Sequence, residues 1–271
     1  MSFFEGGVAV VTGAGSGIGR ALAQKLALAG SALALADVDE AGLQETAESI
    51  SAKGAGLTTS VTNVADEAAM REFASQVVAR HRRVTLLINN AGVALVGRFE
   101  EISLDDLRWL MDINFWGTVY GVKYFLPALK EQPRAHIVNL SSVFGLIAPV
   151  GQSAYCSSKF AVRGFTECLR HELDGTNVYV TSVHPGGIAT PIAKRARLGA
   201  NAPEAAHQRA VALFEKVARI PPAVAADAIL RGVVERQARV LIGGDARFLD
   251  LLQRLRPASY WKVLRKRRPE L

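Results

Sequence analysis

The sequence has little of several features that would place it in other classes of protein. It contains two cysteines, Cys156 and Cys168, and no C-x-x-C pair. A disulfide framework is therefore not expected, and a reducing compartment is expected instead. Its five histidines are scattered without ligand spacing, and no metal site is predicted. The 24 glycines and 10 prolines in 271 residues are too few for a low-complexity chain.

Long uninterrupted apolar runs are also missing. The one long stretch without Lys, Arg, Asp or Glu, residues 135–158, is broken by polar residues, glycine and Pro149, and is not expected to span a membrane. The first six residues lack the basic and apolar regions of a signal peptide. Together with the cysteine usage, these observations predict a cytoplasmic protein.

The net charge of +7 is unevenly distributed. Residues 245–271 hold eight Arg or Lys and three Asp or Glu, a net +5, which leaves +2 for the rest of the chain. The body of the protein is therefore close to neutral, whereas a nucleic-acid-binding domain needs a basic face on the folded body. No nucleic-acid partner is predicted.

Apolar segments typical of buried strands alternate with segments of helical pattern. The expected strands are 8–11, 31–36, 57–64, 85–88, 137–140, 178–183 and 239–242. The expected helices are 17–29, 39–53, 66–81, 103–129 and 152–173. This alternation predicts a single α/β domain over 1–271, a Rossmann-type doubly wound parallel sheet of about seven strands with helices on both faces.

Polar residues and glycines follow the first six expected strands. Because the carboxyl ends of parallel strands meet at one edge of the sheet, these residues should lie together, and such edges bind ligands. The segments are Gly13–Gly19, Asp37, Asn63–Val64, Asn89–Gly92, Ser141–Ser142 and Pro185–Gly187.

The first of these segments, Thr12-Gly13-Ala14-Gly15-Ser16-Gly17-Ile18-Gly19, lies between a strand and a helix. Backbone N–H groups at such a helix start bind phosphate, and glycine allows close approach of a pyrophosphate. The spacing is T-G-x-x-x-G-x-G and not the commoner G-x-G-x-x-G. By itself, the segment is equally compatible with an ordinary loop.

Asp37 ends the second expected strand, where the adenosine ribose of a dinucleotide should lie. A carboxylate there accepts hydrogen bonds from the ribose 2′-hydroxyl and repels a 2′-phosphate. Arg20 is the one nearby cation, and NAD(H) is therefore predicted over NADP(H). The alternative is that Asp37 only caps the next helix.

Tyr155 and Lys159 are four residues apart in an expected helix and so share one face. A nearby ammonium lowers the pKa of a phenol, whose reference value is about 10, and makes it a better acid and base. The alternative is a surface pair without function. Ser141 and Ser142 end the preceding strand and offer a hydroxyl beside the phenol.

Taken together, these motifs resemble the short-chain dehydrogenase/reductase family over residues 7–190. The matching residues are Thr12-Gly13-x-x-x-Gly17-x-Gly19, Asp37, Asn63-Val64, Asn89-Asn90-Ala91-Gly92, Asn114, Ser142, Tyr155-x-x-x-Lys159, Pro185-Gly186 and Thr190. The resemblance implies reversible hydride transfer between nicotinamide C4 and a carbonyl carbon. One departure is Asn63, where the family usually has Asp, but an amide can still hydrogen-bond adenine.

The resemblance also implies a role for each matching residue. Tyr155 would be the general acid and base, Lys159 would bind the nicotinamide ribose, and Ser142 would hydrogen-bond the substrate oxygen. Asn114 would position a water molecule in a proton relay with Lys159. The residues implied to bind the cofactor are Gly13, Ser16, Gly17, Ile18, Gly19, Asp37, Asn63, Val64, Asn90, Ala91, Gly92, Tyr155, Lys159, Pro185, Gly186, Ile188 and Thr190.

Residues 191–221 are alanine-rich and, by the resemblance, form a helical lid over the substrate. Apolar residues near the motifs indicate an apolar secondary alcohol or ketone, although the same residues are equally typical of a core. They are Val93, Leu95, Val143, Phe144, Leu146 and Ile147. The rival function is a sensor or scaffold protein that binds NAD(H) without turning it over.

The C-terminal tail, residues 245–271, is the most individual part of the sequence. An apolar helix face over Phe248, Leu249, Leu251, Leu252 and Leu255 precedes Tyr260, Trp261 and the basic run 265–268. One interpretation is peripheral contact with an anionic membrane. The alternative is a helix that covers the pocket or contacts another subunit. The resemblance further suggests a homodimer or homotetramer formed through the long helices 106–129 and 152–173.

Overall fold

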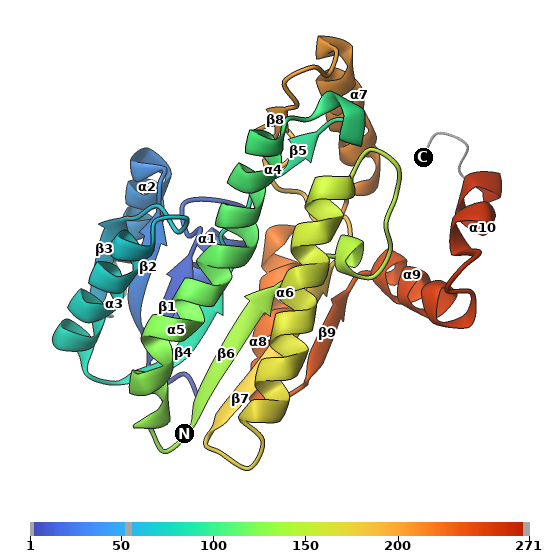
Figure 1. Ribbon diagram of the computed structural model, residues 1–271. Helices are drawn as coiled ribbons and strands as arrows, with labels where there is room; N and C mark the ends of the chain where they lie inside the picture. Colours follow the sequence, from blue (N-terminus) through green and yellow to red (C-terminus); the bar gives the residue numbers. More distant parts are fainter. Residues whose placement is uncertain (1–2, 52–55, 268–271) are drawn as a thin grey trace.

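The computed structural model describes residues 3–51 and 56–267, which contain a seven-stranded parallel sheet with helices on both faces (Figure 1). The strands lie in the order β3-β2-β1-β4-β6-β7-β9. Their bounds are β1 Val8–Thr12, β2 Ala32–Asp37, β3 Leu57–Val61, β4 Val84–Asn89, β6 Ala135–Leu140, β7 Val178–Pro185 and β9 Arg239–Ile242. The predicted doubly wound α/β fold is confirmed.

The helices form two layers. Helices α1, α2 and α8 cover one face of the sheet, and α3, α5 and α6 cover the other. The bounds are α1 Gly17–Leu28, α2 Glu40–Ser51, α3 Glu67–His81, α4 Leu104–Met111, α5 Gly117–Lys130, α6 Ser153–Glu172, α7 Glu204–Val217, α8 Pro222–Val234, α9 Gly244–Leu255 and α10 Tyr260–Arg267. The predicted end of the second helix, Lys53, lies outside the described residues, as does Arg268 of the basic run.

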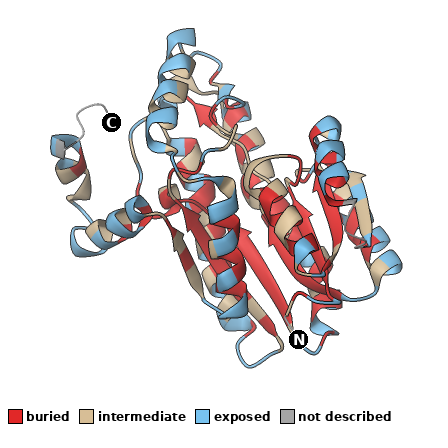
Figure 2. Ribbon diagram, turned by 180° about the vertical axis from the view of Figure 1, so that it is seen from behind, coloured by how far each residue is buried: buried red, intermediate tan, exposed pale blue. Residues whose placement is uncertain are grey.

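Nearly every residue of the central strands is buried, which explains their continuous apolar character (Figure 2). Successive side chains of a strand point to opposite faces, so Ala9 and Val11 of β1 pack against one helical layer and Val10 packs against the other. Aliphatic side chains on both faces therefore fix the sheet between the two layers.

Two short strands and one helix are among the elements that the sequence did not predict. Strands β5, Leu95–Val96, and β8, Arg197–Leu198, form a small parallel sheet of their own. Two residues are too few to show any periodicity. Helix α8 was also missed, although Pro222 at its first turn is typical of a helix start and its inner face is buried.

Candidate active site

The glycine-rich segment forms a cradle between β1 and α1. Gly13 and Gly17 have φ values of +65° and +53°, a conformation that glycine adopts without strain. A Cβ at Gly19 would collide with the carbonyl oxygen of Gly13, and one at Gly17 would lie 3.0 Å from Cγ2 of Thr190. The cradle therefore needs glycine, and the first turn of α1 holds no acidic residue that would repel a phosphate.

Asparagine and threonine side chains fix this cradle to the neighbouring strand β4. Asn90 Nδ2 donates to the carbonyl oxygens of Thr12 and Gly13, at 2.9 and 3.0 Å. Thr12 Oγ1 accepts from the backbone N–H groups of Asn90 and Ala91, each at 3.1 Å. The predicted residues Asn90 and Ala91 thus lie against the glycine loop.

Asp37 is held at the end of β2 beside the same loop. Its Oδ2 accepts from the backbone N–H of Gly15 at 2.7 Å, and its Oδ1 accepts from that of Asp39 at 3.0 Å. Arg20 donates to the carbonyl oxygens of Gly15 and Gly42, and it pairs with Glu45 at 2.7 Å. Arg20 is thus already occupied by protein groups, and Arg195, a second cation on this side, pairs with Asp39 at 3.0 Å.

Tyr155 and Lys159 share one face of α6, as their spacing predicts. The Lys159 Nζ atom lies 5.8 Å from the centroid of the Tyr155 ring, and it donates to the carbonyl oxygen of Leu140 at 3.1 Å. The Ser142 side chain lies near the Tyr155 phenol and acts to lower its pKa. The structure therefore brings Ser142, Tyr155 and Lys159 together at the carboxyl end of β6.

Ser141 and Ser142 differ in what they bind. Ser141 Oγ is buried and donates to the backbone carbonyl of Lys159 at 2.8 Å. Ser142 Oγ accepts from the N–H of Phe144 at 3.1 Å, which leaves its own proton for the phenol or a substrate oxygen. Ser142 is therefore placed for chemistry, and Ser141 for holding α6.

Burial shifts the pKa values of both ionisable groups in this cluster. It raises the pKa of Tyr155 to about 12, against a smaller lowering by the Ser142 hydrogen bond. Burial also lowers the pKa of Lys159 to about 8. The expected lowering of the phenol pKa by Lys159 is thus not seen in the protein alone, where burial is the largest influence on the phenol. The phenol is protonated near neutral pH and can donate a proton.

Asn114 lies in a π-helical segment, Asp112–Trp116, between α4 and α5. Its Oδ1 accepts from the N–H of Val93 at 2.8 Å, and its Nδ2 donates to the Val93 carbonyl and to Ser158 Oγ, at 3.1 and 3.0 Å. A Cβ on Gly92 would lie 3.1 Å from Asn114 Oδ1 and 3.2 Å from Lys159 Nζ. Asn114, Gly92 and Lys159 are therefore neighbours.

The other predicted cofactor residues lie along the same edge of the sheet. Asn63 is exposed in the loop after β3, and Val64 is buried behind it. Pro185 ends β7, and Gly186 donates its N–H to Ile242 at 2.9 Å. Ile188 is buried and forms an isolated bridge with Ile220. Ser16 precedes α1 as its N-cap, and Ile18 packs on the core.

Several residues that support the site were missed by the sequence analysis. Ser158 receives the Asn114 amide and donates to the Tyr155 carbonyl at 2.8 Å. The buried ring of His184 bonds the Ser142 carbonyl through Nδ1 and Ser182 through Nε2, each at 3.0 Å. Ser158 lies one residue before Lys159, but no spacing in the sequence could reveal the contact of His184.

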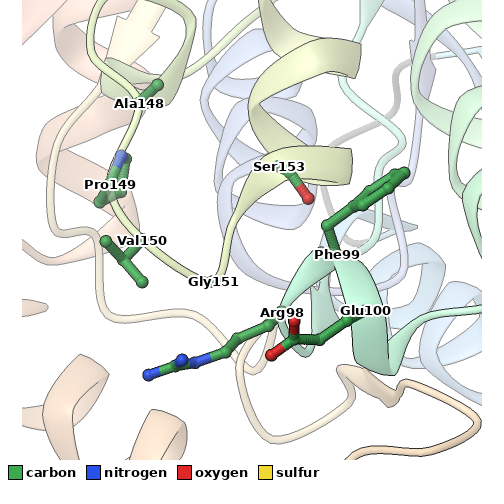
Figure 3. Close-up of a pocket in the computed structure, with 8 residues that line it drawn as sticks. All are labelled: Arg98, Phe99, Glu100, Ala148, Pro149, Val150, Gly151 and Ser153. Atoms are coloured by element: carbon green, nitrogen blue, oxygen red, sulfur yellow. The ribbon is translucent and has the colours of Figure 1, made fainter.

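An open pocket of about 420 Å³ lies beside the first turn of α6 (Figure 3). The loop 148–151, Ser153 and the segment Arg98–Glu100 line it. Of the apolar residues expected to face the substrate, Leu95, Val143, Leu146 and Ile147 are buried, and Val93 is half-buried. Phe144 instead meets the Tyr155 ring edge-on, with 6.1 Å between centroids.

The segment 191–221, expected to form a substrate lid, is tied to the rest of the protein by two arginines. Arg195 pairs with Asp39 at 3.0 Å on the side of Asp37. Arg197 stacks over Trp109, with its Cζ 3.8 Å from the ring centroid, and pairs with Asp106 at 3.5 Å. Helix α7 has no buried residue, so these side chains and the β5–β8 pairing hold the lid in place.

Within residues 3–51 and 56–267, no group of three or more His, Cys, Asp or Glu side chains is arranged to hold a metal ion. Among the helices of those same residues, none is both long and apolar enough to cross a membrane.

The fold and the site define a dinucleotide-binding oxidoreductase, and comparison with known proteins agrees. Residues 7–201 match the family model described as short chain dehydrogenase, and the chain belongs to that family. The chain is 44% identical over 268 residues to SadH of Mycobacterium tuberculosis, which bears an oxidoreductase name, covering 97% of this chain and 96% of that protein.

Two further relatives carry more specific descriptions. One is 1-deoxy-11-beta-hydroxypentalenate dehydrogenase of Streptomyces avermitilis, 32% identical over 262 residues, with 93% of each protein covered. The other is a short chain dehydrogenase/reductase from Burkholderia phymatum, whose crystal structure was determined in complex with NAD. Its sequence is 34% identical, the TM-score is 0.87, and the match covers 95% of this chain and 96% of the Burkholderia chain.

Proposed function

We propose that this protein transfers a hydride reversibly between NAD(H) and an apolar secondary alcohol or ketone. The observation that carries the proposal is the convergence of Ser142, Tyr155, Lys159 and Asn114 at the sheet edge that also holds the glycine cradle. A bound nicotinamide would supply or accept the hydride, and the protein would supply the proton and the orientation of the substrate.

The geometry supports NAD(H) as the cofactor. Cβ atoms at Gly13, Gly17 and Gly19 would crowd neighbouring protein atoms, so the tight turn proposed to receive a pyrophosphate needs glycine. Asp37 presents its carboxylate beside the cradle, and Arg20 is taken up by Glu45 and two carbonyl oxygens. The NAD complex of the Burkholderia relative supports the same choice.

We assign the residue roles as follows. Ser142 donates a hydrogen bond to the substrate oxygen, and Tyr155 donates a proton to that oxygen in reduction and accepts one in oxidation. Lys159 holds the cofactor ribose, and its positive charge stabilises the phenolate. Asn114 positions the relay water beside Lys159; its amide is bonded to Val93 and Ser158, and its carbonyl oxygen accepts from Thr118 Oγ1 at 3.1 Å.

An apolar substrate fits the rim of the pocket. Phe99 and Val150 line the pocket and are exposed, although large apolar side chains are usually withdrawn from water. The Streptomyces relative is, by its name, a dehydrogenase of a hydroxylated pentalenate. A substrate with an apolar skeleton and one secondary hydroxyl group would match both observations.

The remaining assignments are also proposals. The chain is one catalytic domain, with residues 191–221 as its substrate lid, and the described part of the basic tail, residues 245–267, lies beside the pocket. Phe144 and Ile147 of the loop after β6 pack with Trp261 and Leu264 of the tail, which favours the pocket-covering interpretation. The two free cysteines support a cytoplasmic location.

The proposal is tested by following NADH absorbance while the protein is mixed with NAD and a panel of apolar secondary alcohols, with NADP in parallel. Tyr155→Phe keeps the shape of the ring and removes the proton donor. We expect turnover with NAD and a loss of at least about a hundredfold in kcat for Tyr155→Phe, the usual contribution of a general acid or base.

NADH binding to both proteins serves as the control, because Tyr155→Phe should leave the cradle unchanged. Equal turnover by the two proteins would contradict the assigned role of Tyr155. Tight NADH binding without turnover of any alcohol or ketone would favour the rival function, an NAD(H)-binding sensor or scaffold.

A further inference from the structure

The inner faces of the two tail helices are already used within the protein. Leu249 and Leu252 of α9 and Trp261 and Leu264 of α10 pack against the segment after β6. The Tyr260 hydroxyl accepts from the N–H of Ala148 at 3.0 Å. Tyr260 and Trp261 are therefore engaged with the body of the protein, whereas Phe248 of α9 stays 43% accessible, and any membrane contact must use the outer faces.

The outer face of α9 carries exposed leucines. Leu251 and Leu255 are one turn apart, and 56% and 72% of their surface remains accessible. Arg247 and Arg254 lie along one side of this stripe at helical spacing, and both are exposed. An apolar stripe bordered by arginines is typical of helices that lie in the interface of a bilayer, where the arginine stems reach the headgroups.

The acidic residues of α9 are engaged with the body of the protein. Asp245 accepts from the N–H of Gly187 at 2.8 Å. Asp250 pairs with Arg239 at 2.6 Å and with Arg254 at 3.1 Å. The outward charges of α9 and α10 are therefore mainly positive. They are Arg247, Arg256, Lys262, Arg265 and Lys266.

We infer that the outer face of α9 and the basic side chains of α10 dock the protein on an anionic phospholipid surface. The leucines would enter the apolar boundary, and the lysines and arginines would meet the headgroups. A second copy seated on the same face would bring two strongly basic tails together and incur charge repulsion. A nucleic acid would meet the basic side chains but has no apolar layer in which Leu251 and Leu255 could be buried.

Docking at this face would place the lipid surface close to the pocket. Helix α10 contacts Ala148 through Tyr260, and Ala148 is part of the pocket wall. Both tail helices lie at the edge of the molecule beyond β9, on the far side from α3 (Figure 1). An apolar substrate dissolved in the bilayer would then reach the pocket with little exposure to water, a consequence that rests on the proposed function.

The test is co-sedimentation of the full chain with vesicles of phosphatidylcholine, with and without phosphatidylglycerol. Two double variants alter exposed positions only: Leu251→Glu/Leu255→Glu removes the stripe, and Arg265→Glu/Lys266→Glu reverses two charges. The matched control, Arg71→Glu/Arg80→Glu, makes the same charge change on exposed positions of α3. NADH binding and thermal unfolding show that each variant is folded, and no turnover is needed.

We expect binding to the anionic vesicles alone, weakened by salt, and roughly tenfold or more weaker in both tail variants than in the control. Absence of binding by the unaltered protein, or equal binding by all variants, would overturn the inference. If the unaltered protein does not bind vesicles and Leu251→Glu/Leu255→Glu forms a smaller oligomer, a second copy of the protein covers the stripe. That result would also overturn the inference.

Discussion

Lys159 is a cation held inside the protein without a carboxylate partner in the described part of the chain. Its Nζ has the carbonyl oxygen of Leu140 as an acceptor, and burial lowers its pKa from 10.5 to about 8. A lysine with a lower pKa in the folded than in the unfolded state destabilises the fold below the folded pKa. The penalty disappears as pH rises through the window from about 8 to 10.5.

This residue should therefore favour function at the expense of stability. Lys159→Met keeps roughly the length of the side chain and removes the buried charge. We expect the variant to lose turnover and to be more stable than the unaltered protein at pH 7, by about 1–3 kcal/mol after loss of the Leu140 hydrogen bond. The advantage should shrink between pH 7 and pH 9.5, because the unaltered lysine loses its proton there. Thermal unfolding of both proteins at the two pH values measures it.

Lys130→Met, at an exposed position of α5, controls for the general effect of exchanging lysine for methionine. The expectation would be wrong if Lys159→Met were the less stable protein at pH 7, since the hydrogen bond to Leu140 would then outweigh the cost of burying the charge.

The sequence was sufficient to predict which catalytic side chains lie together where that depends on their spacing along a helix. Tyr155 and Lys159 share a helical face because they are four apart, and the structure places them so. Burial could not be predicted in the same way. The tyrosine pKa is raised because neighbouring elements enclose the phenol, and that enclosure involves residues far apart in the chain.

At the scale of elements, the predicted helix over 103–129 is correct in extent and incomplete in form. It contains the π-helical segment Asp112–Trp116, which turns Asn114 toward Val93 and Ser158. A π-helical segment adds one residue to a turn and is common at functional sites. The helical spacing of apolar residues continues in α5 after the π-helical segment. The apolar pattern of 103–129 therefore does not reveal the extra residue.

The proposed lid is held by two arginines with different partners, and this should separate two kinetic effects. Arg197 anchors it to Trp109 and Asp106 of α4. Arg197→Met should raise the KM for the alcohol about two- to fivefold and leave the dissociation of NADH unchanged, as expected for partly exposed contacts. Steady-state kinetics and stopped-flow release of NADH measure the two quantities.

Arg195→Met is the matched variant, because Arg195 pairs with Asp39 on the side of the cofactor. It should speed NADH release by a similar factor with little change in KM. Identical effects of the two variants on both quantities would mean that the lid moves as one unit, and the assignment of one anchor to each side would be incorrect.

At the scale of the whole molecule, exposed aromatic side chains lie on the long helices predicted to join subunits. Trp116, at the start of α5, is 44% accessible and stacks on Tyr120, and Phe160 of α6 is 39% accessible. Large aromatic residues on neighbouring helices are typical of subunit interfaces, where burying them stabilises the assembly. The sequence alone could indicate these helices only through the family resemblance.

We expect the protein to form a homo-oligomer through this face. Trp116→Glu/Phe160→Glu should shift the molar mass in light scattering toward that of a monomer, 29.0 kDa, because two buried carboxylates would face their own copies across a symmetric interface. Leu251→Glu/Leu255→Glu introduces the same charge on α9 and should leave the mass unchanged. If only the α9 variant dissociates, the tail rather than α5 and α6 joins the subunits, and the lipid-docking assignment of the tail fails with it.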